Sequence, residues 1–342
     1  MAANPVHAQP PNPSPDEPSG PATVRLGVFS PSVVLGAAAA SGALARADLT
    51  VQEIPVASSP QQFSLLLKGA LDAVLTSPDN AMAYRRPAAN PLGRTVDVRI
   101  LAAVDRGLGL SLFAAPGVDP VHGLRGSVLG VDAPASGFAV VAYELLERRG
   151  LRRSADYEVE QLGTTPARAE ALVAGRCAMT MLNAGSDLRA EAAGCTRVSR
   201  VSSLGPYIGT VLAALGDVIE RDPSPLRRLT SVLVETCRAL GADEGPSDKH
   251  ADKDDETYGG LREMAAEVAR ARLGLDADGT ARYLATLADP AEGLVPDGRL
   301  DGKSLRTLSV LRSLHAEPEH PDLLPGDADE GLIDERFLRE GG

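Results

Sequence analysis

Hydroxyl, amide and carboxylate side chains gather in short loops, each lying between a short apolar run and a longer amphipathic segment. A serine or threonine in such a loop caps the helix that follows, which stabilises it by about 1 kcal/mol, or it hydrogen-bonds a ligand. Several such loops at one edge of a sheet would bring their polar groups together, which suits a polar or anionic small molecule. The candidate contacts from these loops are Ser30, Ser32, Ser58, Ser59, Thr76, Ser77, Asp79, Asn80, Asp132, Ser136, Gly137, Phe138, Thr164 and Asn183.

Two further candidates lie in glycine-rich stretches. Arg106 falls in DRGLGLS, where its guanidinium would either contact an anionic ligand or remain in solvent. Tyr207 falls in SLGPYIGT, where its ring would either cover a ligand or pack on the neighbouring backbone.

Acid–base chemistry at these loops would have to come from Asp79, Asp105 or Asp132. Each also has a structural interpretation, because Asp79 and Asp132 stand at predicted helix starts and Asp105 could pair with a cation. None of the loops contains histidine or cysteine, so a Cys–His or Ser–His pair cannot be assembled from them. We therefore favour binding over catalysis, and leave an enzyme open as the alternative.

Metal and cofactor sites are poorly supplied by this sequence. Cys177, Cys195 and Cys237 are too scattered for a disulfide framework or a zinc site, and they are expected to be buried small apolar side chains. Of the five histidines only His315 and His320 are close in sequence, in a proline- and acid-rich stretch. We expect neither a metal nor a cofactor.

Net charge excludes one large class of partners. The chain has 34 basic and 46 acidic residues, a net charge of −12, so general attraction to nucleic acid is not expected.

The 20 residues from Leu26 to Ala45 carry no charge, but they contain Pro31 and are rich in alanine, which inserts weakly into membranes. We interpret them as a strand, a turn and a helix, and expect no membrane insertion.

Strand and helix periods alternate along the first two thirds of the chain, which predicts βαβ units and mostly parallel sheets. Strands are predicted at 24–29, 50–55, 73–75, 98–104, 110–114, 127–131, 157–161 and 178–182. Helices are predicted at 33–45, 61–68, 137–149, 165–174, 226–240, 258–273, 280–288 and 304–315, with a helical turn at 122–125. Ser59-Pro60 and Ser77-Pro78 are expected to start helices, with the serine as N-cap and proline at the first helical position.

These elements divide the chain into a two-lobed α/β protein. Residues 1–22 are proline-rich and are expected to be a disordered arm. Residues 23–106 and 207–342 would form lobe 1, including a helical C-terminal extension, and 107–206 would form lobe 2. Extended crossings near 105–111 and 203–210 contain glycines that would permit hinge closure.

Particular segments resemble the nitrate/sulfonate/taurine and thiamine-precursor solute-binding proteins of ABC importers. The first half carries LGVFSPSVVLGAAAASGAL, the GALDA run at 69–73 and the TSPDN loop at 76–80. The second half carries LRGSVLGVDAPASGF and RAEALVAGRCAMTMLN. The resemblance covers about 23–215 and implies the type II periplasmic-binding-protein fold, a small-molecule ligand between the lobes and an ABC permease or other partner protein.

Departures from the family's patterns keep other functions open. The chain contains no tryptophan, so a stacking platform for an aromatic ligand is poorly supplied. Enzymes on the same fold include pyrimidine synthases and aromatic sulfinate desulfinases, yet the desulfinase cysteine after the first strand is replaced here by Phe29-Ser30-Pro31-Ser32. The alternatives to a binding protein are a cytoplasmic biosynthetic or lyase-type enzyme without metal and a ligand sensor that reports to a partner protein.

The expected compartment depends on the N-terminus. No signal peptide or lipid-accepting cysteine is visible, so the chain as written is expected to be cytoplasmic, or extracytoplasmic if an export signal has been trimmed. We expect a monomer.

Overall fold

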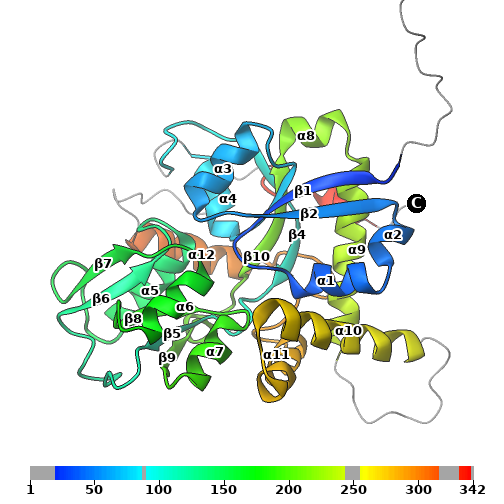
Figure 1. Cartoon of the computed structure of the whole chain (residues 1–342). Coiled ribbons are helices and arrows are strands. Elements are labelled where there is room, and N and C mark those ends of the chain that lie inside the picture. The colour runs from blue at the N-terminus through cyan, green and yellow to red at the C-terminus, as the bar shows by residue number, and fades with distance from the viewer. Residues whose placement is uncertain (1–19, 87–89, 243–254, 316–330, 340–342) are drawn as a thin grey trace, which may run out of the picture.

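Two five-stranded sheets, each flanked by helices, organise the chain (Figure 1). The computed structural model describes residues 20–86, 90–242, 255–315 and 331–339. The first sheet has the order β2(Leu49–Pro55)-β1(Ala22–Val28)-β3(Ala73–Thr76)-β10(Thr210–Leu215)-β4(Val98–Asp105). The second has the order β7(Tyr157–Gln161)-β6(Ser127–Val131)-β8(Met179–Leu182)-β5(Ser111–Ala114)-β9(Thr196–Arg200). The predicted two-lobed α/β class is confirmed.

Both sheets are mixed, because the strands beside each crossing run against their neighbours. β1 is parallel to β2 and β3, whereas β10 is antiparallel to β3 and β4. In the second sheet β6 is parallel to β7 and β8, whereas β5 is antiparallel to β8 and β9. The chain passes from sheet to sheet through 106–110 and returns through 201–209.

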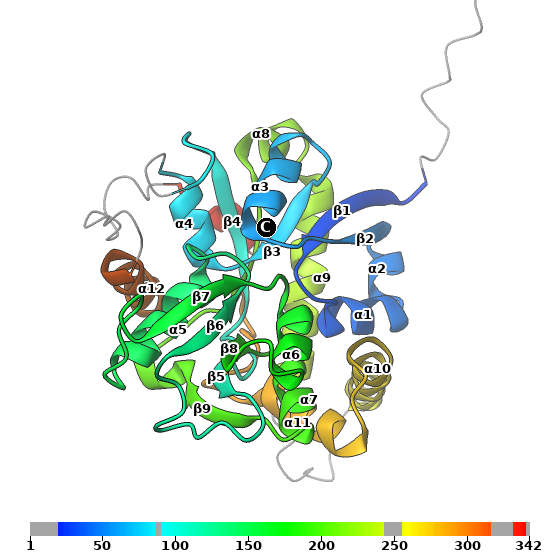
Figure 2. The same cartoon turned by 60° about the vertical axis from the view of Figure 1, so that its left-hand side comes forward.

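The helices cover both sheets and extend beyond them (Figures 1 and 2). They are α1(Val33–Ala40), α2(Ala43–Arg46), α3(Ser59–Leu67), α4(Pro78–Tyr84), α5(Gly137–Glu147), α6(Thr165–Val173), α7(Ser186–Ala192), α8(Gly216–Arg221), α9(Ser224–Gly241), α10(Asp255–Leu273), α11(Ala277–Ala288) and α12(Gly302–His315). α9 packs on β1, β2 and β4, and α1 packs on α9 and α10. α11 contacts α9 and α10 of lobe 1 and also α7 of lobe 2.

Several local expectations need correction. The predicted helix 33–45 is broken at Gly42, whose φ of +76° suits glycine, so α1 and α2 are separate. Ser58, not Ser59, is the N-cap of α3, and residues 122–125 form turns rather than a helical turn. The strands β9 and β10 and the helices α7 and α8 were not expected. β10 is almost wholly buried, and a short apolar run does not distinguish a strand from a helix by periodicity.

The structure agrees with the expectations about the uncharged stretch 26–45 and the three cysteines. The uncharged stretch 26–45 forms part of β1 followed by α1 and α2. Within the described residues, none of the helices combines the length and apolar character needed to span a bilayer. Cys177, Cys195 and Cys237 are buried and unpaired. The expected arm 1–22 lies outside the described residues except for its last three.

The C-terminal region does not pack on lobe 1 alone. α12, which we assigned to lobe 1, contacts α4 of lobe 1 and α5 of lobe 2 (Figure 1). Residues 331–339 then return to lobe 1, where Ile333 pairs in parallel with Ile100 of β4. The backbone N–H of Ile100 donates to Leu332 at 2.7 Å, and that of Asp334 donates to Ile100 at 2.9 Å.

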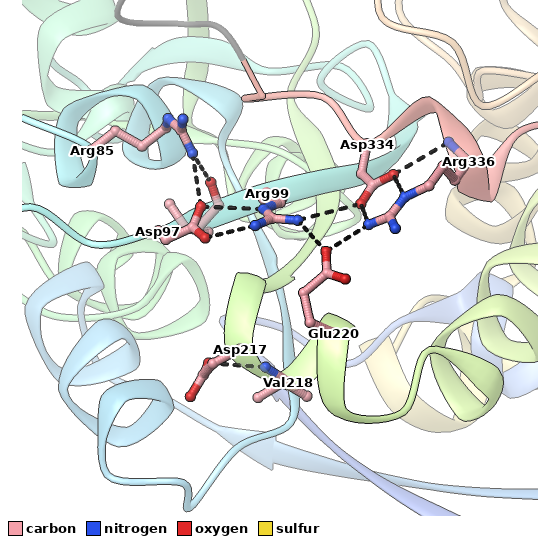
Figure 3. Close-up of polar contacts among 9 residues, drawn as sticks. Arg85, Asp97, Arg99, Asp217, Val218, Glu220, Asp334 and Arg336 are labelled. Carbon is pink, nitrogen blue, oxygen red and sulfur yellow. Dashed lines mark hydrogen bonds and ion pairs between the residues drawn. The ribbon is translucent and has the colours of Figure 1, made fainter.

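A network of ion pairs fixes this returning segment to β4 and α8 (Figure 3). Arg336 pairs with Asp334 at 2.6 Å and with Glu220 at 2.9 Å. Arg99 of β4 pairs with Glu220 at 2.7 Å and with Asp97 at 2.9 Å. Because the charges alternate in sign, each of these carboxylates is shared between two arginines, and together the pairs hold the segment in place.

Candidate functional site

A cavity lies between the lobes, with walls from both sheets and both crossings. Its volume is about 130 Å³. One water needs roughly 10–15 Å³, so the cavity can hold a small molecule of several heavy atoms.

The structure brings eleven of the sixteen candidate residues to this cavity. The lining residues among them are Ser30, Ser32, Thr76, Ser77, Asn80, Asp132, Ser136, Gly137, Phe138, Thr164 and Asn183. They come from the carboxyl ends of β1, β3, β6, β7 and β8, where the sequence placed its polar loops.

The other five candidates lie elsewhere. Ser58 caps α3, where its Oγ accepts from the Gln61 N–H at 3.4 Å, and Ser59 is buried in the first turn of that helix. Arg106 donates from Nη1 to the Leu294 carbonyl at 2.7 Å. Its guanidinium is therefore used by the backbone rather than by the cavity.

Asp79 and Tyr207 are both buried beside the cavity rather than in its lining. Asp79 pairs with Arg312 of α12, with Nε 2.8 Å from Oδ1 and Nη2 on Oδ2. Tyr207 is 2% exposed and packs against Gly107 in the hinge. Its hydroxyl has no hydrogen-bond partner within the described part of the chain, and burial raises its pKa above the ordinary value.

The lobe 1 wall is held by local caps. Ser32 caps α1, since its Oγ accepts from the Leu35 N–H at 3.2 Å. Glu53 of β2 accepts from the Ser32 N–H at 3.0 Å and pairs with Arg272 of α10 at 2.6 Å. In the next loop, the Asn80 amide donates to the Thr76 hydroxyl at 3.1 Å. These contacts fix the loops but leave the cavity-facing edge lined by hydroxyl and amide groups.

The lobe 2 wall contains a buried cation that sequence reasoning missed. Arg168 of α6 is 2% exposed and lines the cavity. Its guanidinium donates to the hydroxyls of Thr180 and Thr165, each at 3.1 Å, and to the carbonyls of Gly163 and Met181. Burial lowers its pKa, and the nearby charge of Asp132 opposes that change.

Asp132 is partly neutralised by its surroundings. Its Oδ1 accepts from the Ser136 hydroxyl at 2.5 Å and lies 4.0 Å from Nη1 of Arg168. Ser136 also caps α5, accepting from the Ala139 N–H at 3.2 Å. The carboxylate therefore lies between a cation and the N-terminus of α5.

The hinge supplies a second carboxylate and one strained residue, which meets a second strained residue from the lobe 2 wall. Asp105 lines the cavity at 3% exposure, and burial raises its pKa to about 6. Leu108 and Ala184 also line it with φ of +49° and +51°, values that are costly for residues other than glycine. The Ala184 N–H donates to the Leu108 carbonyl at 3.1 Å, and the Asn183 amide donates to Gly107 at 2.9 Å. The hinge is thus tied to the lobe 2 wall.

The lobes approach each other closely at one point. A Cβ on Gly137, at the start of α5, would lie 2.9 Å from Oδ2 of Asp79 and 3.0 Å from Oγ of Ser77. Only glycine allows this approach, because a side chain would have to displace the lobe 1 rim.

Signals for the missed residues were weak. Arg168 lies on the same face of α6 as Thr165 and Leu172, and this spacing indicates a buried face. Arginine is seldom buried, so the pattern did not identify Arg168 as a residue of the cavity. Tyr283 lines the cavity from α11, 100 residues after Asn183 in the last polar loop, and no local pattern connects it with the site.

The chemistry that this arrangement supports is recognition. Among the described residues no histidine or cysteine lines the cavity, so it offers no nucleophile–base pair of those kinds. Asp105 is the lining carboxyl group whose pKa is raised closest to neutral pH.

One cluster outside the cavity has the side chains of a metal site. Ligand atoms of Glu144, Glu147 and His315 lie within 4.8 Å of one another on α5 and α12. Glu144 is 2.7 Å from Nε2 of His315, whereas Glu147 is 3.6 Å from Nδ1. The carboxylates thus face different nitrogens of one ring, which suits an imidazole held between two acids better than three ligands around one ion.

Comparisons with known proteins identify the fold. No protein-family profile matches the chain, and no curated protein matches it in sequence. A ligand-binding component of an ABC-type import system from Staphylococcus aureus, solved with zinc bound, superposes with a TM-score of 0.68 at 12% identity, covering 94% of this chain and 99% of that one.

Two solved structures with named ligands are similar over most of the chain. The periplasmic aliphatic sulphonate binding protein SsuA from Escherichia coli gives a TM-score of 0.61 at 16% identity, covering 93% of this chain and 92% of that one. The periplasmic nitrate-binding protein NrtA from Synechocystis PCC 6803 gives 0.65 at 11% identity, covering 92% and 86%. At such identities the likeness establishes the fold and leaves the ligand open. The chain has the fold of periplasmic solute-binding proteins.

Proposed function

We propose that this protein binds one small polar solute in the cavity between its lobes and releases it unchanged, as the substrate-binding component of an ABC importer. The observation that carries the proposal is the cavity itself, to which both lobes and both hinge crossings contribute side chains. A ligand there contacts both lobes at once and so favours the closed arrangement by its differential affinity.

The similar structures support this role in general terms. They are a ligand-binding component of an ABC-type import system, a sulphonate-binding protein and a nitrate-binding protein. Membership of the nitrate/sulfonate/taurine and thiamine-precursor group, and a permease as partner, are parts of the same proposal and rest on the resemblance in sequence.

A second candidate is a lyase-type or biosynthetic enzyme on this fold. The observation that favours it is Asp105, a cavity-lining carboxyl group whose pKa of about 6 would let it exchange a proton near neutral pH. Recovery of the solute after prolonged incubation separates the two, because a binding protein returns it unchanged.

The test is a binding screen with a blocked variant. Sulfonates, nitrate, carboxylates and pyrimidines are screened by thermal shift, and hits are titrated by calorimetry. Thr164→Trp should reduce affinity at least tenfold, because Thr164 lines the cavity and makes no side-chain cap bond that the substitution would remove. Thr196→Trp is the matched control, since Thr196 is exposed on β9.

Equal affinity in the two tryptophan variants would place the ligand outside this cavity. Conversion of the solute into another compound would favour the enzyme over the binding protein.

A further inference from the structure

Asp105 is a buried carboxylate at the floor of the cavity, where β4 ends and the first crossing begins. Its Oδ1 accepts from the Gly107 N–H at 2.8 Å, and the Thr210 side chain hydrogen-bonds the same carboxyl group. A carboxylate can accept about four hydrogen bonds in all, so these two leave capacity for a ligand.

Asp105 makes no ion pair with any residue that the structure describes, and Arg106 acts on it only through its nearby charge. In the part of the chain that the structure describes, no Arg, Lys or His nitrogen forms an ion pair with it within 4.0 Å. Arg106 is adjacent in sequence, but its guanidinium is hydrogen-bonded to the Leu294 carbonyl.

The other two acids near the cavity are compensated. Asp132 lies 4.0 Å from Arg168, and Asp79 is paired with Arg312. Among the described residues, Asp105 is therefore the lining carboxylate without an ion pair.

A structural role for Asp105 does not require that charge. The hydrogen bonds to Gly107 and Thr210 shape the hinge turn, and a neutral asparagine could accept both through its amide oxygen. Burying an unpaired carboxylate costs free energy, so folding alone would favour the neutral side chain at this position. What the charge can do is attract a positive group that enters the cavity.

We propose that the solute carries a protonated amine or another cationic N–H group, which binds the carboxylate of Asp105. The inference rests on the proposed function and specifies its ligand class. Leu108, Leu294 and Tyr283 line the same cavity and provide apolar surface for the carbon skeleton next to the charged group. Arg168 and the N-terminus of α5 line the lobe 2 side, where an acceptor group of the solute would be stabilised.

A solute that is only an anion fits this floor poorly. It would bring a second negative charge into the same enclosed space as Asp105, where like charges repel more strongly than in water. This distinguishes the expected ligand from a bare inorganic anion.

The test uses three probes with the same three-carbon chain: propane-1-sulfonate, propylammonium and 3-aminopropane-1-sulfonate. Calorimetric titration should show at least tenfold tighter binding of 3-aminopropane-1-sulfonate than of propane-1-sulfonate, because its ammonium group adds a charge-assisted hydrogen bond to Asp105. Asp105→Asn should remove at least tenfold of the affinity for both ammonium probes and should not weaken propane-1-sulfonate.

The control variant is Asp217→Asn, which neutralises an exposed carboxylate on α8 and should change none of the affinities. Unfolding curves verify that Asp105→Asn is folded, and the ranking of the probes on the unsubstituted protein tests the inference without any variant.

Three results would overturn the inference while the proposed function stands. The first is propane-1-sulfonate binding as tightly as its amino derivative, and the second is Asp105→Asn retaining the preference for ammonium. The third is binding of a solute without a cationic group from the screen above, when none of the three probes binds. If no solute binds at all, the proposed function falls as well.

Discussion

Replacing Arg312 by methionine should destabilise the protein more than any exposed arginine substitution. Arg312 and Asp79 have side chains that are 3% and 2% exposed, and they meet through two hydrogen bonds. Nη1 of Arg312 also donates to the carbonyl of Ala135, in the loop that lines the cavity from lobe 2. One guanidinium on α12 therefore joins the two lobes.

The expected loss follows from what Arg312→Met leaves behind. Removing one partner of a buried ion pair costs about 3–5 kcal/mol, because the remaining charge stays buried without compensation. The lost bond to Ala135 adds about 1 kcal/mol. With a urea slope of about 3 kcal/mol per M, a loss of about 4–6 kcal/mol lowers the unfolding midpoint by roughly 1.3–2 M.

The assay is urea unfolding followed by circular dichroism, with a matched control and a double variant. Arg221→Met removes an exposed arginine that lies 3.7 Å from Asp217, and it should cost at most about 1 kcal/mol. Asp79→Asn combined with Arg312→Met should recover part of the loss, because no buried charge is then left unpaired.

The reasoning would be refuted by an Arg312→Met variant as stable as Arg221→Met to within about 0.5 kcal/mol. It would also be refuted by strict additivity in the double variant, since residues in direct contact should show an interaction energy of about 0.5–3 kcal/mol.

Two further predictions concern the hinge. Gly209→Ala should lower the free energy of unfolding by about 1–3 kcal/mol, because a Cβ there would lie 2.5 Å from Cα of Gly107. Gly302→Ala is the control and should not lower it, because a Cβ at Gly302 would have no atom within 4 Å. Equal losses of stability in urea for the two variants would contradict this explanation. The pKa of Asp105 is raised from 3.8 to about 6, so the folded state binds its proton more tightly than the unfolded state and stability falls as pH rises from about 4 to 6. Asp105→Asn should therefore be more stable than the unsubstituted protein by up to about 3 kcal/mol at pH 7 and by little at pH 4. Burial also raises the pKa of Asp187 to about 6, but Asp187 is present in both the variant and the unsubstituted protein, so its effect cancels when their stabilities are compared. A stability difference that does not change with pH would therefore contradict the charge of Asp105 as its cause.

Much of the architecture was predictable because it depends on local signals. Alternation of strand and helix periods predicted two α/β lobes, and polar residues after apolar runs predicted which loops meet at the sheet edges. Glycines around 107 and 209 marked the crossings, and the structure places them at 106–110 and 201–209. The sequence pattern did not predict β10, because a short apolar run has no periodicity that distinguishes a strand from a helix.

The direction of β10 was also beyond the sequence. Its pairing with β3 and β4 depends on a chain that has left the first sheet and returned more than a hundred residues later. Only the completed second lobe decides from which side it re-enters, and hence that it lies antiparallel.

For the site, the amino-acid sequence by itself determined which loops carry polar groups, since caps and turns are set by neighbours a few residues away. The tertiary structure alone decided which polar groups face the cavity and which are already used. Asp79 is paired with an arginine 233 positions away, whereas Asp105 makes no ion pair with the described residues, because the guanidinium of Arg106, the next residue, bonds the Leu294 carbonyl. The physical reason is that burial and charge compensation depend on which distant side chains pack together, and periodicity reports only that a face is buried.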